Sequence, residues 1–255
     1  MSAAFTVERT GAIVTLTLAN PERRNTLSLD VMRALIAALG DIATSDARGV
    51  VLAAEGPAFS AGHDLADLDG ADFTSVQRLF DVCTELMDTI QSIPQIVVAR
   101  VHAIAAAAGC QLAASCDLVV AAESAGFALS GVKRGLFCHT PLVAVARNIG
   151  RKRALEMALT GDVIDAHTAA SWGLVNRVVP DDQLDDAVAD LIGRATADSA
   201  WTKSMGKRAF YAQVDLDQPK AYAYAIEVMA NGIVAAPGQE GIRSFLDKRA
   251  PNFDD

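Results

Sequence analysis

The chain is short of several features that mark particular protein classes. Lys and Arg number 22 against 31 Asp and Glu, which gives the 255 residues a net charge of −9. Nonspecific nucleic-acid binding needs a basic face, so we expect no nucleic-acid partner. No apolar run reaches membrane-spanning length, so we expect no membrane insertion. The first residues enter a strand pattern with no basic and apolar leader, which predicts a cytoplasmic protein.

Cysteines and metal-ligand patterns are also sparse. The four cysteines (Cys83, Cys110, Cys116 and Cys138) lack C-x-x-C spacing and sit in apolar surroundings, which predicts reduced, buried thiols. His, Cys and carboxylate residues form no ligand cluster, and no phosphate loop, dinucleotide fingerprint or nucleophile elbow occurs. We therefore expect no metal and no permanently bound cofactor.

What the sequence does contain is an alternation of strand and helix patterns. Residues 4–18 predict two strands turning at Thr10-Gly11. Further strands are expected at 49–53, 96–101 and 118–121, and helices at 29–42, 72–93 and 111–115. Strands that alternate with crossover helices are typical of an α/β fold.

Beyond Arg151 the pattern becomes mainly helical. Helices are expected at 151–159, 166–172, 183–196, 201–212, 221–234 and 238–248, with 175–179 as the single interrupting strand. The change in pattern predicts a core over residues 1–195 and a helical region over residues 196–255.

Two turns made of small residues follow predicted buried strands. One is Ala58–Leu65, and the other is Ala105–Leu112. Turns without large side chains let backbone N–H groups approach a ligand closely. In open α/β sheets ligands bind beyond the carboxyl ends of strands, so N–H groups from both turns converge if the strands are neighbours. Two such donors would form an oxyanion hole for a thioester or acyl oxygen.

These turns resemble the enoyl-CoA hydratase/isomerase (crotonase) superfamily, and the resemblance covers nearly the whole chain. Three further motifs are similar to the family's: Pro21-x-x-Arg24-Asn25-x-Leu27, Leu159-Thr160-Gly161-Asp162 with Ala169-x-x-Trp172-Gly173-Leu174-Val175-Asn176, and Glu240-Gly241-x-x-Ser244-Phe245-x-x-Lys248-Arg249. The pieces Gly-His-Asp-Leu, Ala-Ala-Ala-Ala-Gly-Cys-Gln-Leu and Gly-Leu-Phe-Cys resemble the branch typified by enoyl-CoA hydratase domain-containing protein 3. The resemblance implies a spiral of stacked ββα units and a C-terminal helical region that forms homotrimers, which often pair into hexamers.

The resemblance also implies a ligand, an acyl-CoA thioester, with coenzyme A arriving as part of the substrate. By position in the motif, the backbone N–H groups of His63 and Ala108 would bind the thioester oxygen. Arg24 occupies the family's position for the coenzyme A phosphates. The residues expected to line the ligand around the two turns are Ala61, Gly62, Asp64, Leu65 and Gly109.

The catalytic carboxylates of the family are missing. Its hydratases use two Glu side chains to position water and move protons, and the matching positions here are Gln111 and Gly131. A glutamine amide holds a water molecule but exchanges no proton near pH 7. Because losing one general acid or base typically costs roughly 10²–10⁴-fold in rate, efficient hydration by the family's mechanism is not expected.

His139 is a candidate replacement base, and Cys138 beside it is a second candidate. His139 lies where other branches of the family, such as the aromatic acyl-CoA dehalogenases, place a catalytic Asp, and imidazole titrates near neutral pH. The alternative role for His139 is to cap the helix that begins at Thr140-Pro141. The sequence leaves three functions open: a thioester enzyme with different chemistry, a noncatalytic acyl-CoA binder or assembly partner, and a weak residual hydratase. Hydrolysis, decarboxylation and double-bond migration are all compatible with the first.

Overall fold

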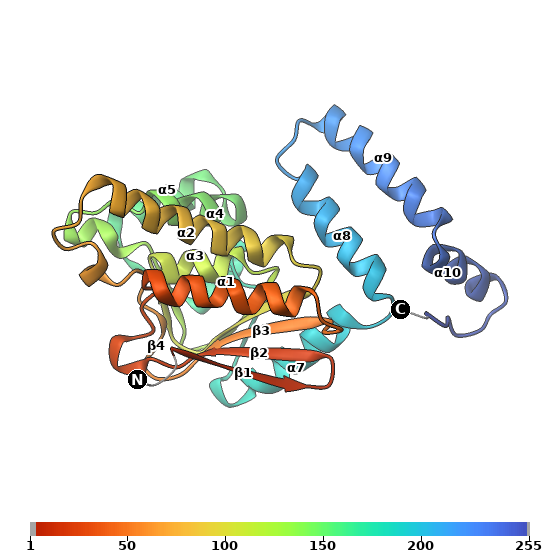
Figure 1. Ribbon diagram of the computed structural model, residues 1–255, viewed down its shortest axis with the longest axis horizontal. Coiled ribbons are helices and arrows are strands. Elements are labelled where there is room, and N and C mark those ends of the chain that lie inside the picture. The colour runs from red at the N-terminus through yellow and green to blue at the C-terminus, as the bar shows by residue number, and fades with distance from the viewer. Residues whose placement is uncertain (1–3, 254–255) are drawn as a thin grey trace.

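The computed structural model describes residues 4–253 and consists of a two-sheet core with a helical arm (Figure 1). The larger sheet has six strands in the order β1-β2-β3-β5-β7-β10. β1 and β2 are an antiparallel hairpin, and the remaining pairs are parallel. The strands are β1 (Phe5–Thr10), β2 (Ile13–Leu18), β3 (Gly49–Ala54), β5 (Ile96–Val101), β7 (Leu118–Ala122) and β10 (Arg177–Val179).

A second, smaller sheet follows the order β4-β6-β8-β9. Its strands are β4 (Ala58–Ser60), β6 (Ile104–Ala106), β8 (Gly126–Ala128) and β9 (Val163–Asp165). Each of β3, β5 and β7 runs into a short strand of this sheet and then into a helix, so the ββα unit repeats. The prediction that 175–179 is the single late strand is wrong, because β9 also pairs with β8. Three-residue strands are too short to show an alternating pattern.

Helices cover both faces of the larger sheet. α7 (Leu184–Thr196) packs on one face through Leu184, Val188 and Ile192. The helices beside the other face and beyond it are α1 (Leu29–Ala43), α2 (Phe73–Ser92), α3 (Ala108–Ser115), α4 (His139–Ile149), α5 (Arg151–Thr160) and α6 (Ala166–Trp172). Side-chain caps set several first turns: the Ser28 hydroxyl, before α1, accepts from the Val31 N–H at 3.3 Å.

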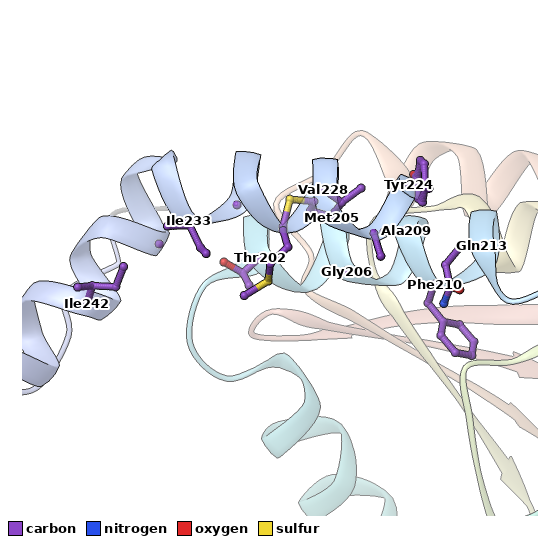
Figure 2. Close-up of a pocket in the computed structure, with 14 residues that line it drawn as sticks. Thr202, Met205, Gly206, Ala209, Phe210, Gln213, Tyr224, Val228, Ile233 and Ile242 are labelled. Carbon is purple, nitrogen blue, oxygen red and sulfur yellow. The ribbon is translucent and has the colours of Figure 1, made fainter. Parts of the chain in front are cut away.

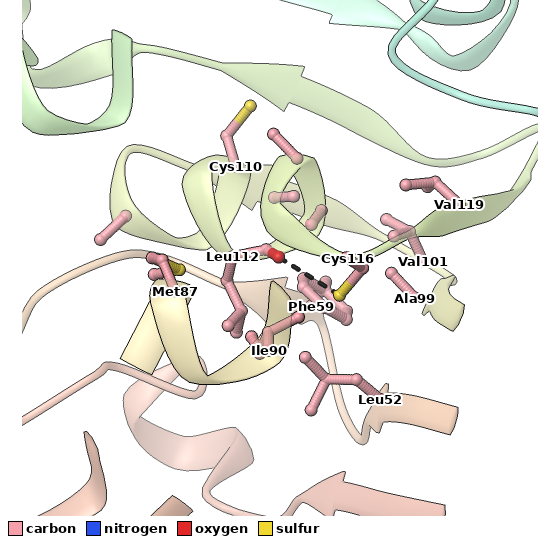
Figure 3. Packing of buried hydrophobic residues seen from close by; sticks show 14 of the residues in the cluster. Leu52, Phe59, Met87, Ile90, Ala99, Val101, Cys110, Leu112, Cys116 and Val119 are labelled. Carbon is pink, nitrogen blue, oxygen red and sulfur yellow. Dashed lines mark hydrogen bonds between the residues drawn. The ribbon is translucent and has the colours of Figure 1, made fainter. Parts of the chain in front are cut away.

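Leu112 of α3 shows how the main core is filled. Its side chain lies among Met87 and Ile90 of α2 and residues of the parallel strands (Figure 3). Cys116 closes the helix end by donating its thiol to the Leu112 carbonyl at 3.3 Å. All eight residues of α3 are buried, so this short helix is an internal element that carries the second small-residue turn.

The last three helices extend from one side of the core (Figure 1). They are α8 (Ala200–Gln213), α9 (Gln218–Val234) and α10 (Ala236–Leu246). The described helices begin one to three residues earlier than predicted because Ser199 and Asp217 cap α8 and α9, and Pro219 and Pro237 fit the first turns of α9 and α10. Within residues 4–253 no helix is both long and apolar enough to cross a membrane. Residues 1–3 and 254–255, at the outer ends of the two predicted regions, lie outside the described residues.

Candidate functional site

Three turns leave neighbouring strands of the smaller sheet at the same edge. β4 pairs in parallel with β6, and β6 pairs in parallel with β8. The segments after these strands carry His63, Ala108 and Gly131 in that order. Because the carboxyl ends of parallel strands lie together, the fold brings the two predicted binding turns and the predicted acid/base position to one edge.

Glycines let the first two turns pack backbone against backbone. A Cβ added at Gly109 would lie 2.2 Å from the Ser60 carbonyl oxygen. A Cβ added at Gly62, whose φ is +92°, would lie 3.1 Å from the Ala108 nitrogen. Gly62 therefore needs to be glycine for its backbone conformation as well as for the close approach. The result is that the backbone at Gly62, next to His63, lies close to the backbone at Ala108.

The two backbone N–H groups of the predicted oxyanion hole have no protein hydrogen-bond partner among the described residues, and Ala108 itself is fully buried. Ala107 has a positive φ of 51° immediately before α3, so Ala108 is the first residue of that helix. The N–H groups of a first helical turn have no partner within the helix. Within residues 4–253, neither the His63 nor the Ala108 N–H donates to a protein acceptor. The predicted start of this helix at Gln111 is wrong by three residues because small residues hid the turn at Ala107.

The loop that carries Arg24 is attached to the first turn. The Ala61 N–H donates to the Arg24 carbonyl at 3.0 Å, and Arg24 is exposed. Asp64 holds the turn itself, because it accepts from the Ala66 N–H at 3.1 Å and pairs with Arg23 at 2.9 Å. Its carboxylate is thus engaged in structure.

Leu65, the next residue, begins a short 3-10 helix and is half exposed.

Gln111 points into the core between α3 and α2. Its side chain is buried, and its Oε1 accepts a weak hydrogen bond from the Cys83 thiol of α2 at 3.8 Å. Burial raises the pKa of Cys83 to about 12, so the thiol keeps its proton and acts as donor. The one side-chain partner that the structure shows for this glutamine within residues 4–253 is therefore a thiol that stays neutral near pH 7.

Gly131 differs from the family pattern by more than a missing carboxylate. A Cβ added there would lie 2.4 Å from the Leu136 carbonyl oxygen and 2.9 Å from the Cys138 Sγ. The segment turns back on itself, with the Leu136 N–H donating to the Gly131 carbonyl at 3.0 Å. The space that a side chain at 131 would use is filled by the returning chain.

Cys138 and His139 face different environments. Cys138 is buried, and its Sγ accepts from the Gly131 N–H at 3.3 Å. Burial raises the pKa of Cys138, so the thiol is protonated near neutral pH. His139 is the first residue of α4 and is exposed, with its ring 4.8 Å from the Phe137 ring. The segment before it contains a 3-10 helix, Ser130–Arg134. The role of His139 as a base stays a prediction.

Comparison with known proteins identifies the family. The enoyl-CoA hydratase/isomerase family model matches residues 8–255. The chain belongs to the enoyl-CoA hydratase/isomerase family. Enoyl-CoA hydratase domain-containing protein 3, mitochondrial, of Rattus norvegicus is 41% identical over 92% of this chain and 79% of its own length. The protein of the same name from Danio rerio is also 41% identical, over 97% of this chain and 88% of its own.

Solved structures agree with this assignment. An enoyl-CoA hydratase from Mycobacterium smegmatis has a TM-score of 0.97 at 44% identity, with full coverage of both chains. Human enoyl-Coenzyme A hydratase domain-containing protein 3 has a TM-score of 0.95 at 39% identity, covering 98% of this chain and all of that one. The predicted crotonase-type α/β fold and the predicted branch of the enoyl-CoA hydratase/isomerase family are both confirmed.

The His63 side chain has a buried arrangement that the sequence analysis, which used only the backbone N–H of this residue, did not predict. Its Nδ1 donates to the Leu27 carbonyl at 3.4 Å, and its Nε2 is inaccessible to solvent with no partner in the described chain. Burial lowers the pKa of His63, so the ring is neutral near pH 7. The ring meets Phe80 of α2 edge-to-face, with centroids 5.3 Å apart. No sequence signal could reveal this arrangement, since the residues come from separate elements. The same described residues contain no group of three or more His, Cys, Asp or Glu side chains placed to hold a metal.

Proposed function

We propose that this member of the enoyl-CoA hydratase/isomerase family binds an acyl-CoA thioester at the turns after β4 and β6. The observation that carries the proposal is the pair of unpartnered N–H groups, at His63 and Ala108, on turns that pack backbone against backbone. Donors of this kind act on an oxygen that gains negative charge, and removing one typically costs about 10²–10³-fold in rate. They would polarise the thioester carbonyl and stabilise an enolate.

The chemistry that follows would differ from two-carboxylate hydration. Gln111 is an amide, and the space for a side chain at Gly131 is closed, so neither position supplies a proton. We propose that His139, or a water molecule held by Gln111, handles the proton of the enolate. Each of the three reactions, hydrolysis, decarboxylation and double-bond migration, passes through a stabilised oxyanion. Decarboxylation then needs one proton delivered to the enolate, whereas hydrolysis and double-bond migration each need one proton removed and one delivered, and each is compatible with this arrangement.

A noncatalytic acyl-CoA binder is the second candidate. It is favoured by the closed segment at Gly131 together with the buried, protonated thiols of Cys83 and Cys138. These features leave the binding turns intact and supply no acid or base beside them. Coenzyme A would then be held without turnover.

Calorimetry and product analysis on one panel of acyl-CoAs separate these functions. Binding followed by a mass change or enoyl formation supports an enzyme, and binding without any product supports the second candidate. No binding by any member of the panel contradicts both. Arg24→Ala should weaken binding several-fold because an exposed guanidinium that meets a phosphate is lost. Arg33→Ala, which removes an exposed arginine of α1, is the matched control.

Residual hydration is tested by Gln111→Glu on its own. The double change with Gly131→Glu is less suitable, because any side chain at 131 meets the Leu136 carbonyl oxygen. If the geometry of the family site is preserved, crotonyl-CoA hydration should rise in Gln111→Glu, measured by loss of enoyl absorbance. An unchanged rate would show that one carboxylate is insufficient.

We also propose that α8–α10 form the interface of a homotrimer, with pairing into a hexamer as the further possibility to be measured. A groove of about 480 Å³ lies between these helices and is lined by apolar side chains including Met205, Val228 and Ile233 (Figure 2). Met229 on its rim is 64% exposed. Met229→Asp should shift the mass in light scattering to that of a monomer. Phe73→Asp, at an exposed apolar site on α2, should leave the mass unchanged.

We propose a cytoplasmic location for this chain. All four cysteines are buried and unpaired, which fits a reducing compartment. The vertebrate relatives carry the word mitochondrial in their names. Cell fractionation tests the proposal: recovery in the cytoplasmic fraction supports it, and recovery in a mitochondrial fraction contradicts it.

A further inference from the structure

The first small-residue turn is held by a segment that lies far from it in the sequence, residues 20–27. The Gly62 carbonyl accepts from the Leu27 N–H at 2.8 Å. The peptide bond between Gly62 and His63 is planar and trans, so its N–H points in the direction opposite to its carbonyl. Because that carbonyl faces Leu27, the His63 N–H points away from residues 20–27.

The Ser60 hydroxyl holds the other side of the same turn. Its Oγ donates to the Asn25 carbonyl at 2.8 Å and accepts from the Gly62 N–H at 3.3 Å. Ser60 is fully buried, so bulk water does not compete for either bond. Gly62 is therefore fixed twice, through its N–H by Ser60 and through its carbonyl by Leu27. A glycine without these bonds has a wide choice of backbone conformations.

Asn25 gives the Ser60 hydroxyl a firm partner. The asparagine side chain is buried, and its Nδ2 donates to the carbonyls of Glu55 and Ala58, each at 2.8 Å. Its Oδ1 accepts from the Asn20 N–H at 2.9 Å. The φ of Asn25 is +52°, a left-handed conformation in which asparagine is enriched. The carbonyl that receives the Ser60 proton is thus set by three further hydrogen bonds of the same residue.

The backbone of Ser60 lies against the second turn. A Cβ added at Gly109 would lie 2.2 Å from the Ser60 carbonyl oxygen and 2.8 Å from the Ser60 Cβ. Gly109 follows Ala108, whose N–H is the second donor of the proposed oxyanion site. One buried serine therefore contacts both turns, through its hydroxyl on the first and through its backbone on the second.

We infer that Ser60 is a positioning residue, which aims the His63 N–H at the thioester oxygen by tying Gly62 to Asn25. The inference rests on the proposed binding of acyl-CoA at the two turns. The buried hydroxyl acts through the backbone and not by contact with the ligand. Without it, the Asn25 carbonyl and the Gly62 N–H each lose a partner, and the peptide that carries the His63 N–H is held from one side only.

The test compares two ligands that differ at one position. Butyryl-CoA carries the thioester carbonyl, and S-butyl-CoA, a thioether with the same number of carbons, has a methylene group in its place. Ser60→Ala should bind butyryl-CoA about fivefold more weakly in calorimetry, which is the ordinary net contribution of one neutral hydrogen bond. Its affinity for S-butyl-CoA should not change, because a methylene group accepts no hydrogen bond.

Ser45→Ala is the matched control. The Ser45 hydroxyl makes the same two kinds of bond: it donates to the Ile42 carbonyl at 2.7 Å and accepts from the Ala47 N–H, two residues on, at 3.2 Å. Ser45 precedes β3, whereas the first turn follows β3 and β4. Its removal should leave the affinities for both ligands unchanged.

A second readout is the carbonyl stretching frequency of bound ¹³C-labelled butyryl-CoA. The wild-type protein should lower this frequency, and Ser60→Ala should lower it less because one donor is misaligned. Ser60→Cys keeps a weak donor and a weak acceptor, so it should lie between the two, and it replaces Ser60→Ala if that variant does not fold.

Equal losses of affinity for the two ligands, or an unchanged affinity and frequency, overturn the inference and leave the proposed function standing. Wild-type protein that binds neither ligand, or binds both equally well, overturns the proposed function itself.

Discussion

The helices α3 and α9 differ in how far their side chains are buried. All eight residues of α3 are buried, whereas none of the 17 residues of α9 is. Apart from Leu112, the apolar side chains of α3 are small and fit between α2 and the sheet. Several of those on α9 are large, and Ile226 and Val234 are 65% and 71% exposed. The chain's own core therefore surrounds α3 and the turn before it. The helical arm instead exposes apolar surface, and covering that surface would stabilise the arm.

The two regions meet at a buried polar cluster. Lys207 of α8 donates to the carbonyls of Ile90 and Gln95 at 2.8 and 2.7 Å and pairs with Asp117 at 2.7 Å. Asp117 also accepts from the Tyr211 hydroxyl at 2.9 Å. The arm is thus fastened to the core by specific polar contacts at its first helix, while α9 and α10 extend beyond it (Figure 1).

Breaking this cluster should have the largest effect. Lys207→Met removes the only cation beside Asp117 that the described contacts show and leaves a buried carboxylate uncompensated. Removing one partner of a buried pair typically costs roughly 3–5 kcal/mol of folding free energy. Chemical denaturation measures the loss. Lys203→Met makes the same change one turn earlier on α8, where the described contacts include no side-chain partner, and should cost far less. Equal losses in the two variants would show that α8 is not held by this pair.

The close backbone packing at Gly109 predicts the next largest effect. Gly109→Ala places a Cβ against the Ser60 carbonyl, a backbone atom that cannot rotate away. Overpacking of this kind typically costs about 1–3 kcal/mol. Gly193→Ala on α7 has no atom within 4 Å of the new Cβ, so the better helix propensity of alanine should stabilise it by up to about 1 kcal/mol. Thermal unfolding of both variants checks the sign. A neutral Gly109→Ala would mean that the turns pack less closely than described.

These glycines mark where sequence reasoning succeeded and where it stopped. The small residues around Gly62 and Gly109 predicted two turns that approach one another, and the structure brings them together. The long strands and amphipathic helices were readable because each has a clear hydrophobic period. The three-residue strands β4, β6, β8 and β9 were not, since their pairing is fixed by the neighbouring turns rather than by any local pattern.

Only part of the acid/base region of the candidate site could be predicted from the sequence. Spacing from the family motifs identified Gln111 and Gly131 as departures. The closure at Gly131 depends on how the segment through Leu136 and Cys138 folds back, which no spacing encodes. The unpartnered Nε2 of His63 likewise depends on contacts with Leu27 and with α2. Contacts between distant segments decide both features.

Removing the Tyr211 hydroxyl should have the smallest of the predicted effects, and it tests one hydrogen bond between α8 and the core. Tyr211 lies 94 positions from Asp117 along the chain, and Tyr211→Phe removes one hydrogen bond while keeping the ring in place. Asp117 retains Lys207 and the Val97 N–H as partners, so the cost should be about 1 kcal/mol. Combined with Lys207→Met, the two costs should not add, because both changes act on the same carboxylate. A double-mutant cycle by chemical denaturation measures this coupling, and strict additivity would mean that Tyr211 stabilises α8 independently of Asp117.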